Sequence, residues 1–383
     1  MRAPGESRAV TPLELFFDLV YVFAISQLTH LLVAQFDLRG AIETLILALA
    51  VVYAWYMTAW LSNWLSPDHR PVQALLLAIM LASLLMSSAI GDAFAGRAWL
   101  FVIPYLAIQI GRAAFATVTF RPGTNQRIHF VNLLGWEIAV APLWIAGALA
   151  DGDARIAFWA AAVVVLHVGV VFYHPVPGRP SHLRAPIGPD AAGVHSDVSG
   201  EHLLERLRLF FLIALGETLI TTGSAFAGEP LAFAPTVALV NAFLGSVALW
   251  YCYFQRAEGI GLRVNESSED ASGIASLGTH ALTIVFLALI AIAAGDEFAI
   301  AHPGDDPGAG YLGLTFGGPA LFLLGQVYFL WSVGETRRRA RTLGIGALGV
   351  LALVTSGTSL LAASIAATAV LVAVAISDAT TRA

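Results

Sequence analysis

The sequence predicts an all-α polytopic membrane protein, with about twelve transmembrane helices arranged as two parallel six-helix repeats. Three observations lead to this prediction. Hydrophobic residues make up 58% of the 383-residue chain and charged residues only 12%, whereas soluble domains carry about 25% charged residues. Uncharged runs long enough to cross a bilayer as a helix alternate with short polar breaks. The two halves of the chain also repeat one series of short motifs.

The apolar runs define the expected helices in chain order. In the first half the expected spans are 13–35, 41–61, 72–90, 98–119, 128–149 and 154–174. In the second half they are 203–226, 231–254, 272–294, 311–333, 342–356 and 358–377. Only Ser356-Gly357-Thr358 separates the last two, so they form either a tight helical hairpin or a partly re-entrant segment. Gly313 and Gly317 form a GxxxG motif, which predicts close helix packing.

The positions of the arginines predict the orientation of these spans. The chain has no lysine, so all 20 of its basic residues are arginine. If the N-terminus is cytoplasmic, the outer breaks contain only Arg39, Arg97 and Arg155, and one further arginine, Arg112, lies within a span. The other arginines fall in inner segments. Because basic residues concentrate on the cytoplasmic side, we expect both termini to be cytoplasmic and the number of spans to be even.

The repeated motifs occur in the same order in both halves. Their offset increases along the chain only across polar breaks, as small loop insertions after a duplication would require. The matched segments are Leu13–Phe17 with Leu207–Phe211, Trp55-Tyr56 with Trp250-Tyr251, Gly91–Ala95 with Gly295–Ala299, and Gly111, Arg127 and Gly135 with Gly325, Arg341 and Gly349. Duplicated membrane units are common in transporters, where the functional site lies between the halves.

The repeat also predicts the domain organisation. Residues 1–174 form an N-terminal six-helix membrane repeat, 175–202 a cytoplasmic linker rich in Pro, Gly and His, and 203–383 a C-terminal six-helix membrane repeat. Six spans per copy keep both copies in the same orientation. The repeats are therefore expected to be parallel, and to be related by an axis along the membrane normal.

Ionisable residues inside the expected spans are the main functional candidates, because a charge at membrane depth is costly. Their positions are Glu14 and Asp18 in the first span, Arg112 in the fourth, Glu137 in the fifth, and Arg206, Arg208 and Glu217 in the seventh. Glu14 matches Arg208 in the repeat, so these two could pair across a pseudo-two-fold axis. Arg112 could pair with Asp18, which would reduce the desolvation cost. The alternative is that those near the inner interface only extend to water or lock the halves together.

Aromatic and histidine side chains near these charges are candidates for lining a pocket. They are Tyr21, His30, Trp55, Tyr56, Trp250 and Tyr251. Such a wall would suit a hydrophobic or cationic ligand. The alternative is that these residues pack between helices or form the aromatic belt at the membrane interface.

Several chemistries are excluded by composition. The absence of lysine excludes a retinal-type Schiff base and a lysine nucleophile. A single cysteine, Cys252, excludes an intrachain disulfide and an all-cysteine iron–sulfur site. No nucleotide-binding or hydrolase motif occurs in a suitable context. We therefore expect no catalytic residue, no metal site, no cofactor and no nucleic-acid partner.

Two segments resemble signatures of the bacterial low temperature requirement A (LtrA) family. They are Thr11–His30, with the core Leu-Glu-Leu-Phe-Phe-Asp, and Glu205–Thr218, which ends in Leu-Gly-Glu-Thr. The family often has serine where Thr218 stands here, a change that keeps the hydroxyl. The resemblance marks Glu14, Phe17, Asp18, His30, Arg206, Gly216 and Glu217 as signature residues. It implies a multi-pass protein of the bacterial plasma membrane, named for growth in the cold, and it implies no particular substrate.

Three functions fit these observations. The first is a secondary transporter or an ion or proton pathway, in which Glu217 and Glu137 are protonatable groups, Glu14 and Asp18 form an inner gate, and the arginines balance charge. The second is a membrane-embedded enzyme acting on a lipid or isoprenoid. The third is a non-catalytic scaffold or stress-response protein in which the buried charges hold helices together. The expected partners are membrane lipids and a small solute or ion, and the oligomeric state stays open.

Overall fold

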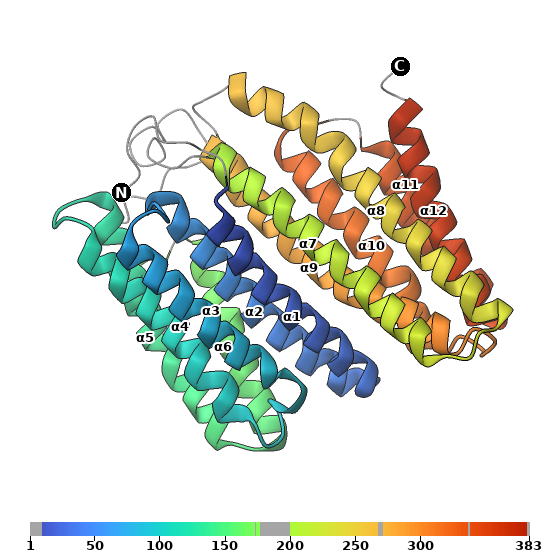
Figure 1. Cartoon of the computed structure of the whole chain (residues 1–383), viewed down its shortest axis with the longest axis horizontal. Coiled ribbons are helices and arrows are strands. Elements are labelled where there is room, and N and C mark those ends of the chain that lie inside the picture. The colour runs from blue at the N-terminus through green and yellow to red at the C-terminus, as the bar shows by residue number, and fades with distance from the viewer. Residues whose placement is uncertain (1–9, 173, 177–199, 267–270, 336–337, 381–383) are drawn as a thin grey trace. The chain divides into compact units, whose positions relative to one another are not determined.

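The computed structural model describes residues 10–172, 174–176, 200–266, 271–335 and 338–380. Within these residues the regular structure is helical and no strand occurs (Figure 1). The first six helices are α1 (Pro12–Ala34), α2 (Leu38–Trp64), α3 (Arg70–Ser88), α4 (Ala98–Thr119), α5 (Asn125–Leu149) and α6 (Gly152–Val171). The other six are α7 (Gly200–Gly228), α8 (Phe233–Glu266), α9 (Ala271–Ala301), α10 (Ala309–Ser332), α11 (Arg339–Val354) and α12 (Leu360–Thr380). These helices confirm the predicted fold class.

All 12 helices contain a stretch long and apolar enough to cross a membrane. The chain is therefore a helical membrane protein with many spans. The last two helices are separate and are joined through the short 3-10 turn Thr355–Gly357, as expected of a tight hairpin. Most of the expected linker, at 177–199, lies outside the described residues.

The end of α9 differs from the prediction. The ninth span was expected to stop at 294, but α9 continues to Ala301 because good helix formers follow, and it stops just before His302-Pro303-Gly304. Asp296 therefore lies inside a helix. Its expected counterpart in the repeat, Asp92, lies in the 3-10 turn Ile90–Asp92 after α3. The two matched segments thus differ in local structure, and the two-repeat arrangement stays a prediction.

The chain divides into two compact units. The first comprises Met1–Leu28 and Ile42–Leu203, and the second comprises Thr29–Ala41 and Leu204–Ala383. The end of α1 and the beginning of α2 thus group with the second unit. Within the first unit, α4 packs against α3 and α5, and α5 packs against α6. The most apolar stretch of α2 is 83% buried, the largest share among the 12 candidate spans, so polar side chains on α2 can be shielded from lipid.

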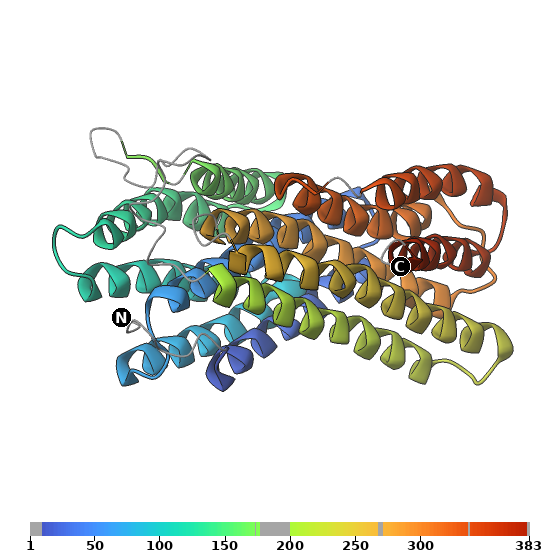
Figure 2. The same ribbon diagram turned by 90° about the horizontal axis from the view of Figure 1, so that it is seen from above.

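In the second unit, α9 and α10 form the most extensive helix pair, while α12 packs against α8 and α11. These helices run along a common direction (Figure 2). The close contact between α9 and α10 occurs at Gly318 and Gly325. A Cβ atom added at Gly318 would lie 2.9 Å from a side-chain carbon of Ile292, and one at Gly325 would lie 3.2 Å from the Ala281 carbonyl oxygen. Helices approach this closely only where the side chain is missing.

The predicted GxxxG motif is therefore wrong as a packing site. A Cβ atom at Gly313 or Gly317 would meet nothing within 4 Å. Gly318 follows Gly317 directly, so the small-residue face of α10 is rotated by about 100° from the motif.

A buried ion pair joins three helices of the second unit. Arg341 at the start of α11 lies 2.6 Å from the Asp378 carboxylate near the end of α12, and both side chains are almost fully buried. The Arg341 guanidinium also donates a hydrogen bond of 2.8 Å to the carbonyl oxygen of Cys252 on α8. Arg341 was expected to be one of the inner-loop arginines. It instead neutralises a buried carboxylate and fastens α11 and α12 to α8.

Breaking this pair should destabilise the protein strongly. Arg341→Met leaves the Asp378 carboxylate buried without its cation, and we expect a loss of about 3–5 kcal/mol in the free energy of unfolding. Thermal unfolding of the detergent-purified protein measures this loss. The double variant Arg341→Met/Asp378→Leu should recover most of it, because no isolated charge remains. A double variant as unstable as the sum of both single variants would contradict this account.

Candidate functional site

The first unit contains a network of buried polar side chains around α2. We call Asp18, Tyr53, Trp55, Arg112 and Glu137 the α2 network. Each has 3% or less of its surface exposed. They come from α1, α2, α4 and α5, so four helices contribute polar groups to the interior of one unit. The membrane stabilises charge so poorly that such groups need partners inside the protein.

Glu137, in the middle of α5, engages two partners through one carboxylate oxygen. The Tyr53 hydroxyl on α2 donates a hydrogen bond of 2.8 Å to Oε1. The Arg112 guanidinium on α4 lies 3.6 Å from the same oxygen. That separation is an ion pair and is too long for a good hydrogen bond. Glu137 is therefore held firmly by the phenol and more loosely by the cation.

Arg112 directs its hydrogen bonds to neutral oxygens. It donates to the Gln109 side-chain oxygen one turn earlier on α4. It also donates to the Ala54 carbonyl and to the Thr58 hydroxyl on α2, each at 3.3 Å. A pairing of Arg112 with Asp18 was one possibility from the sequence, but the carboxylate partner of Arg112 is Glu137. The reason is geometric, since α4 packs directly against α5.

Asp18 on α1 is bound to α2 through an indole. Trp55 Nε1 donates a hydrogen bond of 2.8 Å to Asp18 Oδ1. One turn further along α1, the Tyr21 hydroxyl oxygen accepts a hydrogen bond of 3.0 Å from Ser83 on α3. Phe17 lies against the Tyr21 ring, with 5.1 Å between ring centroids. The first signature segment therefore places Asp18 and Tyr21 toward the interior of the unit.

Glu14 has a structural role that the sequence analysis missed. Its carboxylate accepts hydrogen bonds from the Thr11 backbone N–H at 2.9 Å and the Thr11 hydroxyl at 3.0 Å. The Thr11 hydroxyl in turn accepts one from the Glu14 backbone N–H at 3.3 Å. Together with Pro12 at the first helical position, this is a capping box that starts α1. The spacing Thr-Pro-Leu-Glu was the available signal. His202 Nε2 also lies 3.4 Å from this carboxylate.

The remaining charged candidates belong to the second unit. Glu217 on α7 is buried and accepts a hydrogen bond of 3.2 Å from the Thr221 hydroxyl one turn later. Arg206 on the same helix is fully buried. Arg208 is only half-buried, and its guanidinium carbon lies 5.9 Å from the ring centroid of Phe254, a cation–π distance.

The aromatic candidates separate into inward and outward groups. Trp55 and Tyr56 on α2 are buried, as is Tyr21. Trp250 and Tyr251 on α8 are 40% and 44% exposed, and His30 is also exposed. Exposed aromatics on a membrane helix suit a lipid-facing or belt role, and a pocket-lining role for Trp250, Tyr251 and His30 stays a prediction.

Several polar residues were missed as site candidates. Tyr53 binds the Glu137 carboxylate, and Gln109 and Thr58 bind Arg112. Asp296 lines a cavity of the second unit, but the ninth span was expected to end before it. Over the described part of the chain, no three His, Cys, Asp or Glu side chains lie close enough to hold a metal ion.

The indole of Trp55 should contribute to stability through Asp18. Trp55→Phe removes the donor to a buried carboxylate, and we expect it to cost about 1–3 kcal/mol in the free energy of unfolding. Trp250→Phe is the matched control, because Trp250 is the expected repeat counterpart and is exposed. Its change should stay within about 0.5 kcal/mol. Equal effects of the two substitutions on thermal unfolding in detergent would contradict the importance of the Asp18 contact.

Comparisons with known proteins agree with this architecture. The family model described as bacterial low temperature requirement A protein (LtrA) matches residues 9–376. An uncharacterized protein of Rhizobium meliloti (strain 1021) is 31% identical over 321 residues, which cover 82% of this chain and 75% of the relative. The resemblance in the two signature segments is therefore confirmed over nearly the whole chain. The protein belongs to the bacterial low temperature requirement A (LtrA) family and is a member with many membrane spans.

Proposed function

We propose that the protein is a secondary transporter or an ion or proton pathway of the bacterial plasma membrane, and that the α2 network is part of its pathway. The observation that carries this proposal is the Glu137 carboxylate, which sits in the middle of a membrane span between the Tyr53 hydroxyl and the Arg112 guanidinium. Ionisable groups at such depth mark ion paths and proton relays more often than simple packing.

Protonation of Glu137 would affect Arg112 directly. A proton on Glu137 would remove the charge that Arg112 pairs with. Arg112 would nevertheless keep its hydrogen bonds to Gln109, Thr58 and the Ala54 carbonyl. Loading a proton would leave the buried Arg112 cation without its counter-charge, so the step must be coupled to the arrival of another negative charge or to a movement of the helices.

A link to α1 follows from the contacts of α2. Tyr53 and Trp55 are two residues apart on α2, so they face different neighbours and bind Glu137 on α5 and Asp18 on α1 respectively. A shift of α2 would change both carboxylate contacts together. In the proposal, this coupling connects the middle of the membrane with the cytoplasmic end of α1, where Glu14 and Asp18 lie.

Glu217 is a second protonatable group, and Arg206 and Arg208 balance the charge of carboxylates or of an anionic solute. Both termini are cytoplasmic, because the arginines concentrate in the segments on that side. The partners are membrane lipids and a small solute or ion.

Proton flux into proteoliposomes tests the proposal directly. Vesicles with a pH-sensitive dye inside are exposed to an imposed pH and voltage gradient. We expect flux with the wild type and none with Glu137→Gln, because the amide cannot carry a proton. Asp92→Asn is the control, since Asp92 is an exposed carboxylate in a surface turn, and it should conduct like the wild type. Tyr53→Phe should change the rate without abolishing it.

Two results would count against the proposal. Equal flux with Glu137→Gln and the wild type would remove Glu137 from the pathway, and Glu217→Gln would then be the next variant. Absence of flux in every variant, with and without candidate solutes, would favour a membrane-embedded enzyme or a scaffold.

A further inference from the structure

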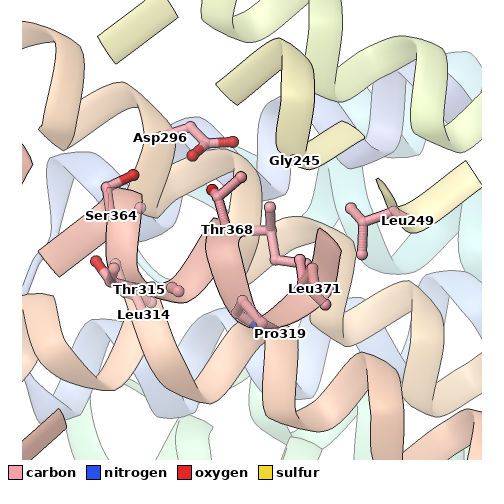
Figure 3. A pocket seen from close by; sticks show the side chains of 12 residues that line it. Gly245, Leu249, Asp296, Leu314, Thr315, Pro319, Ser364, Thr368 and Leu371 are labelled. Carbon is pink, nitrogen blue, oxygen red and sulfur yellow. The ribbon is translucent and has the colours of Figure 1, made fainter. Parts of the chain in front are cut away.

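A small cavity lies inside the second unit, between α8, α9, α10 and α12. Its volume is about 20 Å³, room for a single water or a small ion. Apolar side chains and glycines form much of the lining. Four residues supply polar side chains to it: Asp296, Thr315, Ser364 and Thr368. Figure 3 shows these side chains around the space, from α9, α10 and α12.

Asp296 is the acidic member of the lining. It lies five residues before the end of α9, within the stretch that is apolar enough to cross the membrane. Across the described ranges its carboxylate has no hydrogen bond and no ion pair with another side chain. Asp296 is half-buried, and an ionised carboxylate without a partner inside a membrane span is costly. Asp296 therefore needs either a proton or a cation.

Thr315 lines the same cavity from α10. Its hydroxyl has no hydrogen-bond partner within the described residues, although only 8% of the residue is exposed. Its carbonyl oxygen also lacks the usual helical donor. The residue four positions later is Pro319, which has no N–H and which also lines the cavity. Pro319 thus leaves the Thr315 carbonyl oxygen inside the membrane span without its usual helical donor.

The two hydroxyls from α12 complete the set of oxygens. Ser364 accepts a hydrogen bond of 2.8 Å from the Asn241 side chain on α8. This donor fixes the Ser364 oxygen and leaves a lone pair for another partner. Thr368 lies one turn later on the same helix and lines the same cavity. Hydroxyl, carbonyl and carboxylate oxygens are the ligands that hard cations prefer.

We propose that this cavity is a binding site for a monovalent cation of about the size of sodium. Asp296 supplies the charge, and Thr315, Ser364 and Thr368 supply neutral oxygens. One carboxylate balances one positive charge, whereas a divalent cation would keep a net charge in an apolar surrounding. In some transporters backbone carbonyls at an interrupted helix bind Na⁺, and in the continuous helix α10 Pro319 leaves the Thr315 carbonyl without its usual helical donor. This site is separate from the α2 network and goes beyond the function proposed for it.

Binding of ²²Na⁺ to the purified full-length protein in detergent tests the site without any transport step. We expect saturable binding at pH 8 that unlabelled NaCl displaces. Asp296→Asn should abolish it, because the neutral amide cannot balance the cation, and Thr315→Val should weaken it. Glu297→Gln is the matched control. It changes the neighbouring carboxylate on the same helix, which does not line the cavity, and it should bind like the wild type.

A further variant separates binding from folding. Pro319→Ala restores the N–H that the Thr315 carbonyl lacks, so it should strengthen α10 while it weakens ²²Na⁺ binding. If Asp296→Asn does not give a folded protein, Thr315→Val and Pro319→Ala decide the question. Each must weaken binding in a protein that unfolds at the wild-type temperature or higher.

Three results would overturn the proposal. They are no saturable ²²Na⁺ binding to the wild type, unchanged binding to Asp296→Asn, and equal loss with Asp296→Asn and Glu297→Gln. None of them depends on Glu137, so failure of this site and failure of the proton pathway can be told apart. Wild-type flux that Glu137→Gln abolishes would leave the pathway intact even if Na⁺ does not bind.

Discussion

The free-energy cost of placing charge inside a membrane determines how both units are built. The contact of Glu137 with Tyr53 and Arg112 shows this most clearly. A carboxylate and a guanidinium that are almost fully buried must satisfy each other or find polar neighbours, because lipid offers none. Here α2 provides those neighbours. Its phenol, its indole, one threonine hydroxyl and one backbone carbonyl all serve charged groups from α1, α4 and α5. The burial of α2 and the charges around it therefore depend on each other.

The second unit stabilises its buried charges in two different ways. Near one end of the unit, Arg341 and Asp378 form a close pair, and Cys252 supplies a further acceptor. Further toward the other end of the bundle, Asp296 lies beside a cavity lined by hydroxyl groups. A closed ion pair is suited to holding helices together, because separating its two partners would leave each charge buried without a counter-charge. A carboxylate beside an open space is suited to binding a small cation reversibly.

Small local features decide which residues meet. Pro319 withholds one hydrogen-bond donor from the carbonyl of Thr315, and both residues line the cavity beside Asp296. Gly318 and Gly325 allow α10 to approach α9 closely, which brings the cavity-lining residues of the two helices together. The capping box at Thr11 and Glu14 fixes the first turn of α1, and so sets the residue at which this helix begins. Each feature is readable in the sequence, but its consequence is visible only once the neighbouring helix is known.

The sequence by itself determined the class of the protein, the order and approximate limits of its membrane helices, and its family. Hydropathy and arginine placement are properties of single segments facing lipid or water, so they need no knowledge of packing. The Glu14 capping signal was equally local, and it was overlooked. The tertiary structure decided the partner of each buried charge: Glu137 for Arg112, Trp55 for Asp18, and Asp378 for Arg341. It also decided that Trp250 and Tyr251 face outward and that Asp296 borders a cavity. These outcomes depend on helix rotation and on which helices are neighbours. Long-range packing sets both, because a uniformly apolar span has no strong polar face to fix its orientation in advance.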